Sequence, residues 1–203
     1  MDKPPKAYKD PQFINSREGR IVRMLSEYIQ PEAKFRENEI YHTVVFFGSA
    51  RIHPDNNEHG TAEYYNIARE FSYKLAKYSE ELKNETGETF YICTGGGPGV
   101  MEAANRGAKD AGVKTLGLNI SLPFEQHPNP YITESLAFEF HYFFMRKLWL
   151  LYHAKAIIVF PGGFGTFDEL FETLTLIQTK KMIKQIPVLL YDSTYWNDLI
   201  NFQ

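Results

Sequence analysis

Short apolar runs alternate with segments of helical periodicity along most of the chain. Runs bounded by turn-forming residues predict buried strands at residues 41–47, 89–94, 114–120, 156–160 and 186–191, and a short strand at 137–140. Apolar positions at helical spacing predict helices over 61–78, 100–111 and 142–154, a fourth from about Gly165, and a last one starting near Thr194. This alternation indicates a Rossmann-like α/β fold, a doubly wound parallel sheet.

The two ends of the chain differ from this pattern. Residues 1–15 are rich in proline and lysine and predict an extended N-terminal arm. A helical pattern then runs from Ser16 to about Glu37 and is interrupted by Pro31. Residues 16–203 are expected to form a single Rossmann-like domain. The last helical pattern breaks off at residues 201–203, so we expect the C-terminal end to be truncated.

Composition and charge narrow the classes of function. The 203 residues are 43% hydrophobic, which suffices for one core, and the net charge of -3 leaves no electrostatic footprint for nucleic acid. No apolar run is long enough to cross a membrane, and the N-terminus lacks a signal-peptide core, so we expect a cytoplasmic protein.

The six histidines show no metal-ligand spacing, so no metal site is predicted. Cys93 lies in an apolar run and is expected in the core.

Two junctions join a strand to a helix through glycine-rich turns, GGGPGVME at 95–102 and PGGFGTFDE at 161–169. Both turns are expected at the carboxyl edge of the sheet, where α/β folds bind ligands. Free backbone N–H groups and the helix dipole favour a phosphate there, with Glu169 about one turn into the second helix. The alternative is that the glycines only permit tight turns. Neither junction has a P-loop pattern, and Val100 replaces the third glycine of the dinucleotide fingerprint.

Arg146 and Lys147 are adjacent cations on an otherwise aromatic and aliphatic helix. They form either a surface pair whose stems cover apolar residues or a clamp that points into the cleft and binds phosphate or carboxylate. Asp168 is expected to compensate the dipole of the second glycine-turn helix.

These motifs together resemble the Lonely Guy family, the cytokinin riboside 5′-monophosphate phosphoribohydrolases formerly labelled lysine decarboxylases. The residues that carry the resemblance are GGGPGVMEAANRGA at 95–108, MRK at 145–147 and PGGFGTFDE at 161–169, which has every fixed position of the family signature PGGxGTxxE. FFGSAR at 46–51 and LPFEQHPNPY at 122–131 are similar to the longer bacterial-type branch.

The resemblance implies a role for each matching residue. Arg146 and Glu169 match the family's essential pair, and Gly163, Gly165 and Thr166, with Gly162 beside them, match its 5′-phosphate site. Further substrate-binding positions implied by the resemblance are Lys147, Thr175, Gly96, Gly97, Gly99 and Met101. Glu125 is the candidate for an acidic residue that the family has upstream. The resemblance also implies a homodimer without a cofactor.

The expected activity is hydrolysis of the N-glycosidic bond of a nucleoside 5′-monophosphate, either AMP or a cytokinin riboside 5′-monophosphate. Glu169 would stabilise positive charge on the ribose and orient or deprotonate water, by analogy with glycosidase carboxylates. Arg146, always protonated, would anchor the phosphate or stabilise the departing base. A non-catalytic nucleotide or cofactor carrier is the main alternative. A decarboxylase would need pyridoxal phosphate on a lysine, and no lysine has a convincing setting. Neither nucleic acid nor a membrane is an expected partner.

Overall fold

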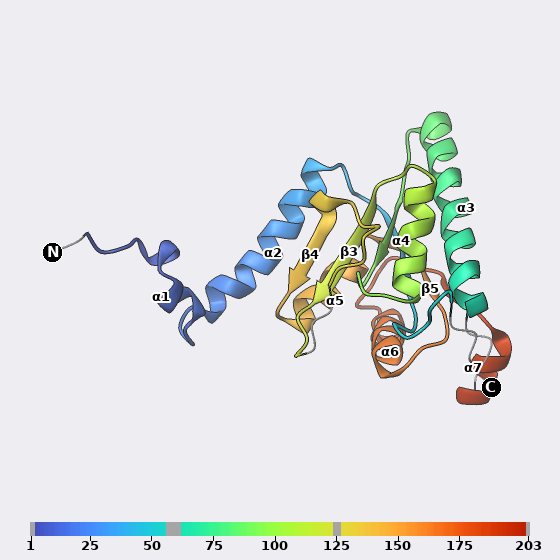
Figure 1. Ribbon diagram of the computed structural model, residues 1–203. Coiled ribbons are helices and arrows are strands. Elements are labelled where there is room, and N and C mark those ends of the chain that lie inside the picture. The colour runs from blue at the N-terminus through green and yellow to red at the C-terminus, as the bar shows by residue number, and fades with distance from the viewer. Residues whose placement is uncertain (1–2, 56–61, 124–126, 202–203) are drawn as a thin grey trace.

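The computed structural model describes residues 3–55, 62–123 and 127–201, and its centre is one parallel sheet (Figure 1). Six strands lie in the order β4-β3-β2-β1-β5-β6, and every neighbouring pair is parallel. The strands are β1 (Thr43–Phe47), β2 (Tyr91–Thr94), β3 (Thr115–Ile120), β4 (Ala137–Phe140), β5 (Ala154–Val159) and β6 (Val188–Leu190). This arrangement confirms the predicted doubly wound α/β fold.

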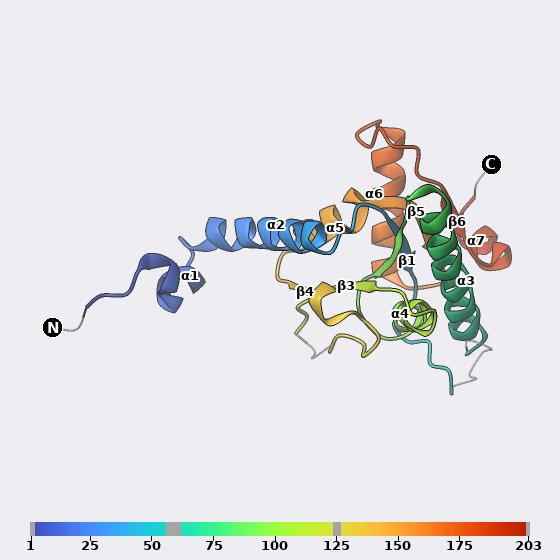
Figure 2. The same ribbon diagram turned by 90° about the horizontal axis from the view of Figure 1, so that it is seen from above.

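Helices cover both faces of the sheet (Figure 2). One face carries α3 (Ala62–Thr86) and α4 (Val100–Asp110), and the other carries α2 (Arg20–Glu37), α5 (Phe143–Tyr152) and α6 (Phe164–Gln178). The 3₁₀ helix η3 (Glu134–Leu136) leads into β4, and α7 (Ser193–Leu199) follows β6. None of the helices in the described ranges is long and apolar enough to cross a membrane.

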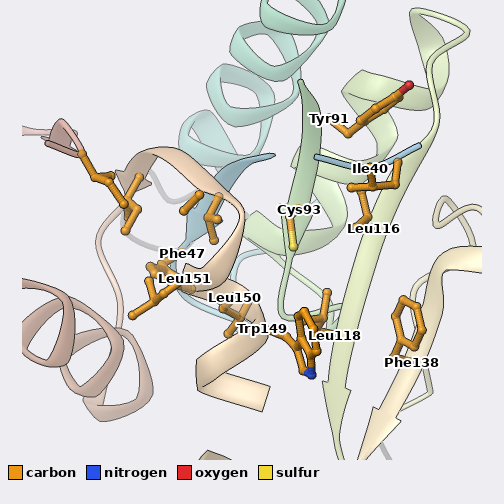
Figure 3. Close-up of a cluster of buried hydrophobic side chains, with 14 of the residues drawn as sticks. Ile40, Phe47, Tyr91, Cys93, Leu116, Leu118, Phe138, Trp149, Leu150 and Leu151 are labelled. Atoms are coloured by element: carbon orange, nitrogen blue, oxygen red, sulfur yellow. The ribbon is translucent and has the colours of Figure 1, made fainter. Parts of the chain in front are cut away.

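The strands supply core residues to both faces because successive side chains point in opposite directions. Val45 and Phe47 of β1 belong to the cluster beneath α5 and α6, whereas Val44 and Phe46 belong to the cluster beneath α3 and α4. Figure 3 shows part of the first cluster, in which Cys93 is buried as predicted. Burial on both faces explains why the strands read as continuous apolar runs.

Two elements extend beyond their predicted bounds. Helix α3 continues to Thr86, well past residue 78, and Ser79 in the added turns donates a hydrogen bond of 2.7 Å to the carbonyl of Phe90. Strand β5 starts at Ala154 rather than at residue 156, because Ala154 pairs with Thr43 at the start of β1. In both places tertiary contacts extend an element beyond its apolar pattern.

Helix α2 runs without a break through Pro31, contrary to the predicted interruption. A proline cannot donate to the carbonyl four residues earlier, which here belongs to Glu27. That carbonyl instead accepts a hydrogen bond of 3.1 Å from the indole Nε1 of Trp149 on α5. The packing of α2 against α5 therefore satisfies the group that Pro31 leaves free.

The N-terminal arm projects away from the sheet in both views (Figures 1 and 2). It is not extended throughout, contrary to the prediction, because it contains the 3₁₀ helix η1 (Ala7–Lys9) and the short helix α1 (Pro11–Asn15). The carboxylate of Asp10 caps α1 by accepting from the N–H groups of Gln12 and Phe13. Pro11 at the first helical position and an acidic cap together favour this local turn.

Candidate active site

The carboxyl edge of the sheet brings three loops together around β1. The chain leaves β1 toward β2 on one side, while β5 lies on the other, so the loops after β1 and β5 meet at a topological switch point. Ser49, after β1, joins them: its N–H donates to the carbonyl of Pro161 at 3.1 Å. The carbonyl of Ser49 accepts from the N–H of Val100, at the start of α4, also at 3.1 Å. Both predicted glycine turns therefore border one site.

The second glycine turn leaves the start of α6 open. Gly163 is the N-cap and provides no side-chain cap, and the first helical hydrogen bond runs from the N–H of Phe167 to its carbonyl. No described residue accepts from the N–H groups of residues 164–166. A Cβ added to Gly163 or Gly165 would meet nothing within 4 Å. Free donors, open space and the helix dipole make this turn suited to an anion.

Gly162, in contrast, is tightly enclosed. A Cβ at this position would lie 2.2 Å from Oγ1 of Thr166 and 3.0 Å from the backbone nitrogen of Ser49. The hydroxyl of Tyr195 on α7 donates to the carbonyl of Gly162 at 2.7 Å and lies 3.3 Å from its N–H. Tyr195 therefore fixes the turn from outside. Sequence reasoning missed this residue, because one tyrosine in a helix carries no distinguishing signal.

Arg146 crosses from α5 to the carboxyl edge and is only 7% exposed. Its Nε donates to the carbonyl of Leu118 on β3 at 2.7 Å, and its Nη1 donates to Oε1 of Glu169 at 2.8 Å. A Cβ on Gly95 would lie 2.3 Å from Nη2. A surface pair is therefore the wrong interpretation for Arg146, whose guanidinium joins β3, the first glycine turn and α6.

Glu169 is the partly buried partner of this ion pair, with a side chain 14% exposed. Burial raises the pKa of Glu169 above its usual value, although the adjacent Arg146 guanidinium acts in the opposite direction. A carboxyl with a raised pKa that borders an open anion site can exchange a proton closer to neutral pH than an ordinary glutamate.

Lys147 points away from this pair. Its Nζ lies 2.9 Å from a carboxylate oxygen of Asp168 and 2.9 Å from one of Glu172. Burial lowers the pKa of Lys147, but hydrogen bonds to these two carboxylates outweigh it and raise the pKa overall. Asp168 lies beyond the first turn of α6 and pairs with Lys147, so the prediction that it compensates the helix start was wrong.

The first glycine turn is held by a buried polar network. The side-chain amide of Asn129 donates to the carbonyls of Gly96 and Gly97 at 3.1 Å each and to Oδ1 of Asn105 at 2.9 Å. Asn105 in turn donates to Oγ1 of Thr115 and to the carbonyl of Leu116. Asn129 comes from the proline-rich loop, and sequence reasoning gave neither asparagine a role.

The remaining predicted residues divide into two groups. Gly96 and Gly99 have positive φ values of 76° and 74°, as tight turns require, and Sδ of Met101 would lie 2.9 Å from a Cβ on Gly95. Thr175, however, is exposed in a later turn of α6 and donates to the carbonyl of Phe171 at 2.7 Å, so the chain does not bring it to the pair.

Two further expectations concern residues or groups beyond this site. Glu125 lies outside the described residues. Within the described ranges, no three His, Cys, Asp or Glu side chains are grouped so that they could hold a metal ion.

A family model described as "Possible lysine decarboxylase" matches residues 101–203, half of the chain. The chain belongs to this family, the Lonely Guy family. Two similar family members are the cytokinin riboside 5′-monophosphate phosphoribohydrolases LOG2 and LOG3 of Arabidopsis thaliana. LOG2 is 27% identical over 141 residues, which are 68% of this chain and 60% of LOG2. LOG3 is 29% identical over 113 residues, which are 53% of this chain and 49% of LOG3. The chain thus spans 60% or less of these relatives.

Solved structures show the same architecture. The match to the X-ray structure of TM1055 covers 66% of this Lonely Guy chain and 69% of the TM1055 chain, with 29% identity and a TM-score of 0.51. The match to the molybdenum cofactor binding protein from Rippkaea orientalis covers 75% of this chain and 78% of that protein, with 21% identity and a TM-score of 0.50. The second similarity concerns the fold alone.

Proposed function

We propose that the protein hydrolyses the N-glycosidic bond of a nucleoside 5′-monophosphate and releases the free base and ribose 5-phosphate. The observation that carries the proposal is the buried Arg146–Glu169 pair, 2.8 Å apart, beside the uncapped start of α6. The names of the Arabidopsis relatives favour a cytokinin riboside 5′-monophosphate as the substrate, and AMP is the second substrate that we propose.

The start of α6 would bind the 5′-phosphate. The open positions at Gly163 and Gly165 let an anion approach the free N–H groups of the first turn. Glu169 belongs to the second turn of the same helix, so the position of the phosphate also fixes how far the ribose lies from this carboxylate. A rigid helix therefore supplies both the anchor and the reacting group.

Glu169 would act on the ribose. Breaking the glycosidic bond develops positive charge on the sugar ring, and an ionised carboxylate nearby stabilises that charge and orients or deprotonates the attacking water. Its raised pKa makes it a better proton acceptor near neutrality than an ordinary glutamate. Arg146 stays protonated, so it would stabilise negative charge on the phosphate or on the departing base rather than donate a proton.

The test measures both products. Purified protein is incubated with AMP and with isopentenyl-AMP, and free base and ribose 5-phosphate are quantified by chromatography. We expect equal amounts of base and sugar phosphate from the wild type and from Asp168→Asn, whose carboxylate contacts Lys147 outside the pair. Absence of base in the wild type, or equal turnover by Glu169→Gln, would contradict the proposal.

Nucleotide binding without cleavage is the second candidate, because the open glycine turn alone suffices to hold a phosphate. Calorimetry that shows AMP binding while no base appears would identify a carrier.

The family description also names decarboxylation, which requires a lysine of lowered pKa. Lys147 has the opposite property, because two carboxylates raise its pKa. Burial lowers the pKa of Lys184, but its Nζ donates to the carbonyl of Tyr152 at the end of α5 rather than to a group of the ion pair. An absorbance band of pyridoxal phosphate bound to the purified protein would revive that function.

We further propose that two copies associate through α5. This helix exposes Phe143, Phe144, Leu148 and Tyr152, each at least 40% exposed, and with α6 and residues 181–184 it borders a groove of about 630 Å³. Aromatic and aliphatic side chains gathered on one surface favour association. Light scattering should give the mass of a dimer for the wild type and a lower mass for Leu148→Glu. The control Tyr78→Glu, on α3 across the sheet, should stay dimeric; a monomeric wild type at micromolar concentration would refute the proposal.

A further inference from the structure

Asp192, the N-cap of α7, has an uncommon backbone conformation. Its φ of 71° lies in the left-handed region, which residues other than glycine seldom adopt. The described part of the chain has two more such residues, Glu39 before β1 and Lys180 after α6. Only Asp192 lies at the carboxyl edge of the sheet, two residues after the end of β6. Such strain persists only where surrounding contacts hold the residue, and it often marks a functional position.

The carboxylate of Asp192 makes three hydrogen bonds. Its Oδ1 accepts from the N–H groups of Thr194 and Tyr195 at 3.1 and 3.2 Å, which caps α7. Its Oδ2 accepts at 2.5 Å from the hydroxyl of Tyr64 in the first turn of α3, which lies beside α7 (Figure 1). This bond raises the pKa of Tyr64 to about 12 and lowers the pKa of Asp192. At neutral pH the hydroxyl is therefore protonated and the carboxylate ionised.

Helix α7 passes this restraint on to the glycine turn before α6. The hydroxyl of Tyr195 donates to the carbonyl of Gly162 at 2.7 Å and accepts from the N–H of Gly162 at 3.3 Å. A continuous chain of hydrogen bonds thus runs from Tyr64 through Asp192 and Tyr195 to Gly162. Gly162 directly precedes Gly163, the N-cap of α6, so the chain ends beside the free N–H groups of the anion site.

Aromatic packing links the same two segments by a second route. The ring of Tyr191, next to Asp192, meets the ring of Tyr64 edge-on at 6.1 Å between centroids. It also stacks on the ring of Phe160, with 4.7 Å between centroids and 25° between planes. The hydrogen-bond route reaches the chain one residue after Pro161, and the aromatic route reaches it one residue before. The turn is therefore restrained on both sides.

We propose that Asp192 and Tyr64 are positioning residues for the phosphate-binding turn of α6. They hold α7 where Tyr195 fixes Gly162, and so keep the free N–H groups aligned for a phosphomonoester. This inference rests on the proposed function, which places the 5′-phosphate there. Donors that are not aligned beforehand must be ordered when the ligand binds, which weakens binding. Because the phosphate is bound in both substrate and transition state, the loss should appear in KM rather than in kcat.

The experiment measures ribose 5-phosphate affinity by calorimetry, and KM and kcat for AMP, in the wild type, Tyr64→Phe and Tyr65→Phe. Tyr64→Phe keeps the ring against Tyr191 and removes only the hydroxyl bonded to Asp192. It should weaken ribose 5-phosphate binding and raise KM, each about fivefold, with kcat within about twofold of the wild type. Tyr65→Phe is the matched control on α3, because its hydroxyl also donates to a carboxylate, that of Glu102 on α4, at 2.8 Å. It should keep the wild-type affinity and KM.

A double-mutant cycle separates positioning from a general loss of stability. If Tyr64 acts through Tyr195, adding Tyr64→Phe to Tyr195→Phe should weaken ribose 5-phosphate binding no further, because the last link is already missing. Additive losses would overturn the proposed route. If Tyr64→Phe does not fold, Asp192→Asn replaces it. Asparagine also adopts the left-handed conformation but lacks the charge, so it should weaken binding in the same direction.

The outcomes distinguish this inference from the proposed function. Unchanged ribose 5-phosphate affinity and KM in Tyr64→Phe would overturn the positioning role alone, and so would an equal loss in Tyr65→Phe. If the protein binds AMP without cleaving it, the hydrolytic function fails, and AMP affinity in the same variants decides the role of Tyr64. A wild type that binds neither AMP nor ribose 5-phosphate would overturn both.

Discussion

Glu169→Gln replaces a buried carboxylate with an amide of the same shape, and its effects on stability and activity should differ sharply. Two unit charges about 4 Å apart attract by roughly 4 kcal/mol at an effective dielectric constant near 20. Here burial outweighs this attraction, because the pKa of Glu169 is raised despite the adjacent Arg146. Arg146 keeps its bond to Leu118 and can still donate to the glutamine oxygen. We therefore expect a stability loss below the roughly 3–5 kcal/mol typical of breaking a buried pair.

The activity should fall much further. Loss of a preorganised charge at the reacting centre typically costs roughly 100-fold or more in kcat, which corresponds to about 2.7 kcal/mol. The assay measures kcat by release of base from AMP, alongside thermal unfolding by circular dichroism. Asp168→Asn is the control, because it neutralises the carboxylate one residue earlier, which pairs with Lys147. A Glu169→Gln enzyme that retains more than a tenth of wild-type kcat would refute this reasoning.

The pH dependence of stability gives an independent check on Glu169. Because its pKa is higher in the folded protein, the native state binds more protons than the unfolded state between the usual glutamate value and the raised value. The contribution of Glu169 to stability is therefore fully present at low pH and is lost as the pH rises through this window. Glu169→Gln lacks this loss and should gain stability relative to the wild type over the same range. Melting curves that stay parallel from acid to neutral pH would contradict the raised pKa.

Three further predictions concern the two glycine turns. Gly162→Ala should lower activity and stability, because a Cβ there meets Thr166 and Ser49. Gly163→Ala places its Cβ in open space and should fold normally. The two variants are compared by their expression and their melting temperatures. Tyr195→Phe removes the hydrogen bond to Gly162 and should raise KM for AMP several-fold with little change in kcat, as steady-state kinetics would show. Asn129→Leu leaves the carbonyl of Gly97 unpaired, whereas the carbonyl of Gly96 keeps its bond from the backbone N–H of residue 129, so the substitution should cost about 1–3 kcal/mol in the free energy of urea unfolding.

The fold and the centre of the site were predictable because their signals are local. A strand buried on both faces must be a continuous apolar run, and a glycine-rich turn between a strand and a helix exposes backbone donors whatever the rest of the chain does. Arg146 was conspicuous because its helix is otherwise aromatic and aliphatic. The other interpretation of Arg146, as part of a surface pair with Lys147, could be rejected only from the burial of Arg146 and its hydrogen bond to the carbonyl of Leu118.

The supporting residues were not predictable, because their roles come from contacts between distant segments. Tyr195 is 33 residues from Gly162, and Asn129 is 24 residues from Asn105. Neither residue type is unusual in its own segment. Thr175 shows the opposite error: it fits a motif in the sequence, but its place on α6 turns it away from the ion pair.

The geometry also explains why one helix start is a better catalytic anchor than the other. At α4, the carbonyl of Ser49 already accepts from the first N–H, so part of that helix start is occupied by the protein itself. At α6, the first-turn donors have no described partner, and the same helix carries Glu169. An anion bound at α6 is therefore positioned by the element that also holds the reacting carboxylate. An anion at α4 would depend on the packing between α4, α5 and α6 for the same alignment, and small shifts between helices would then cost rate.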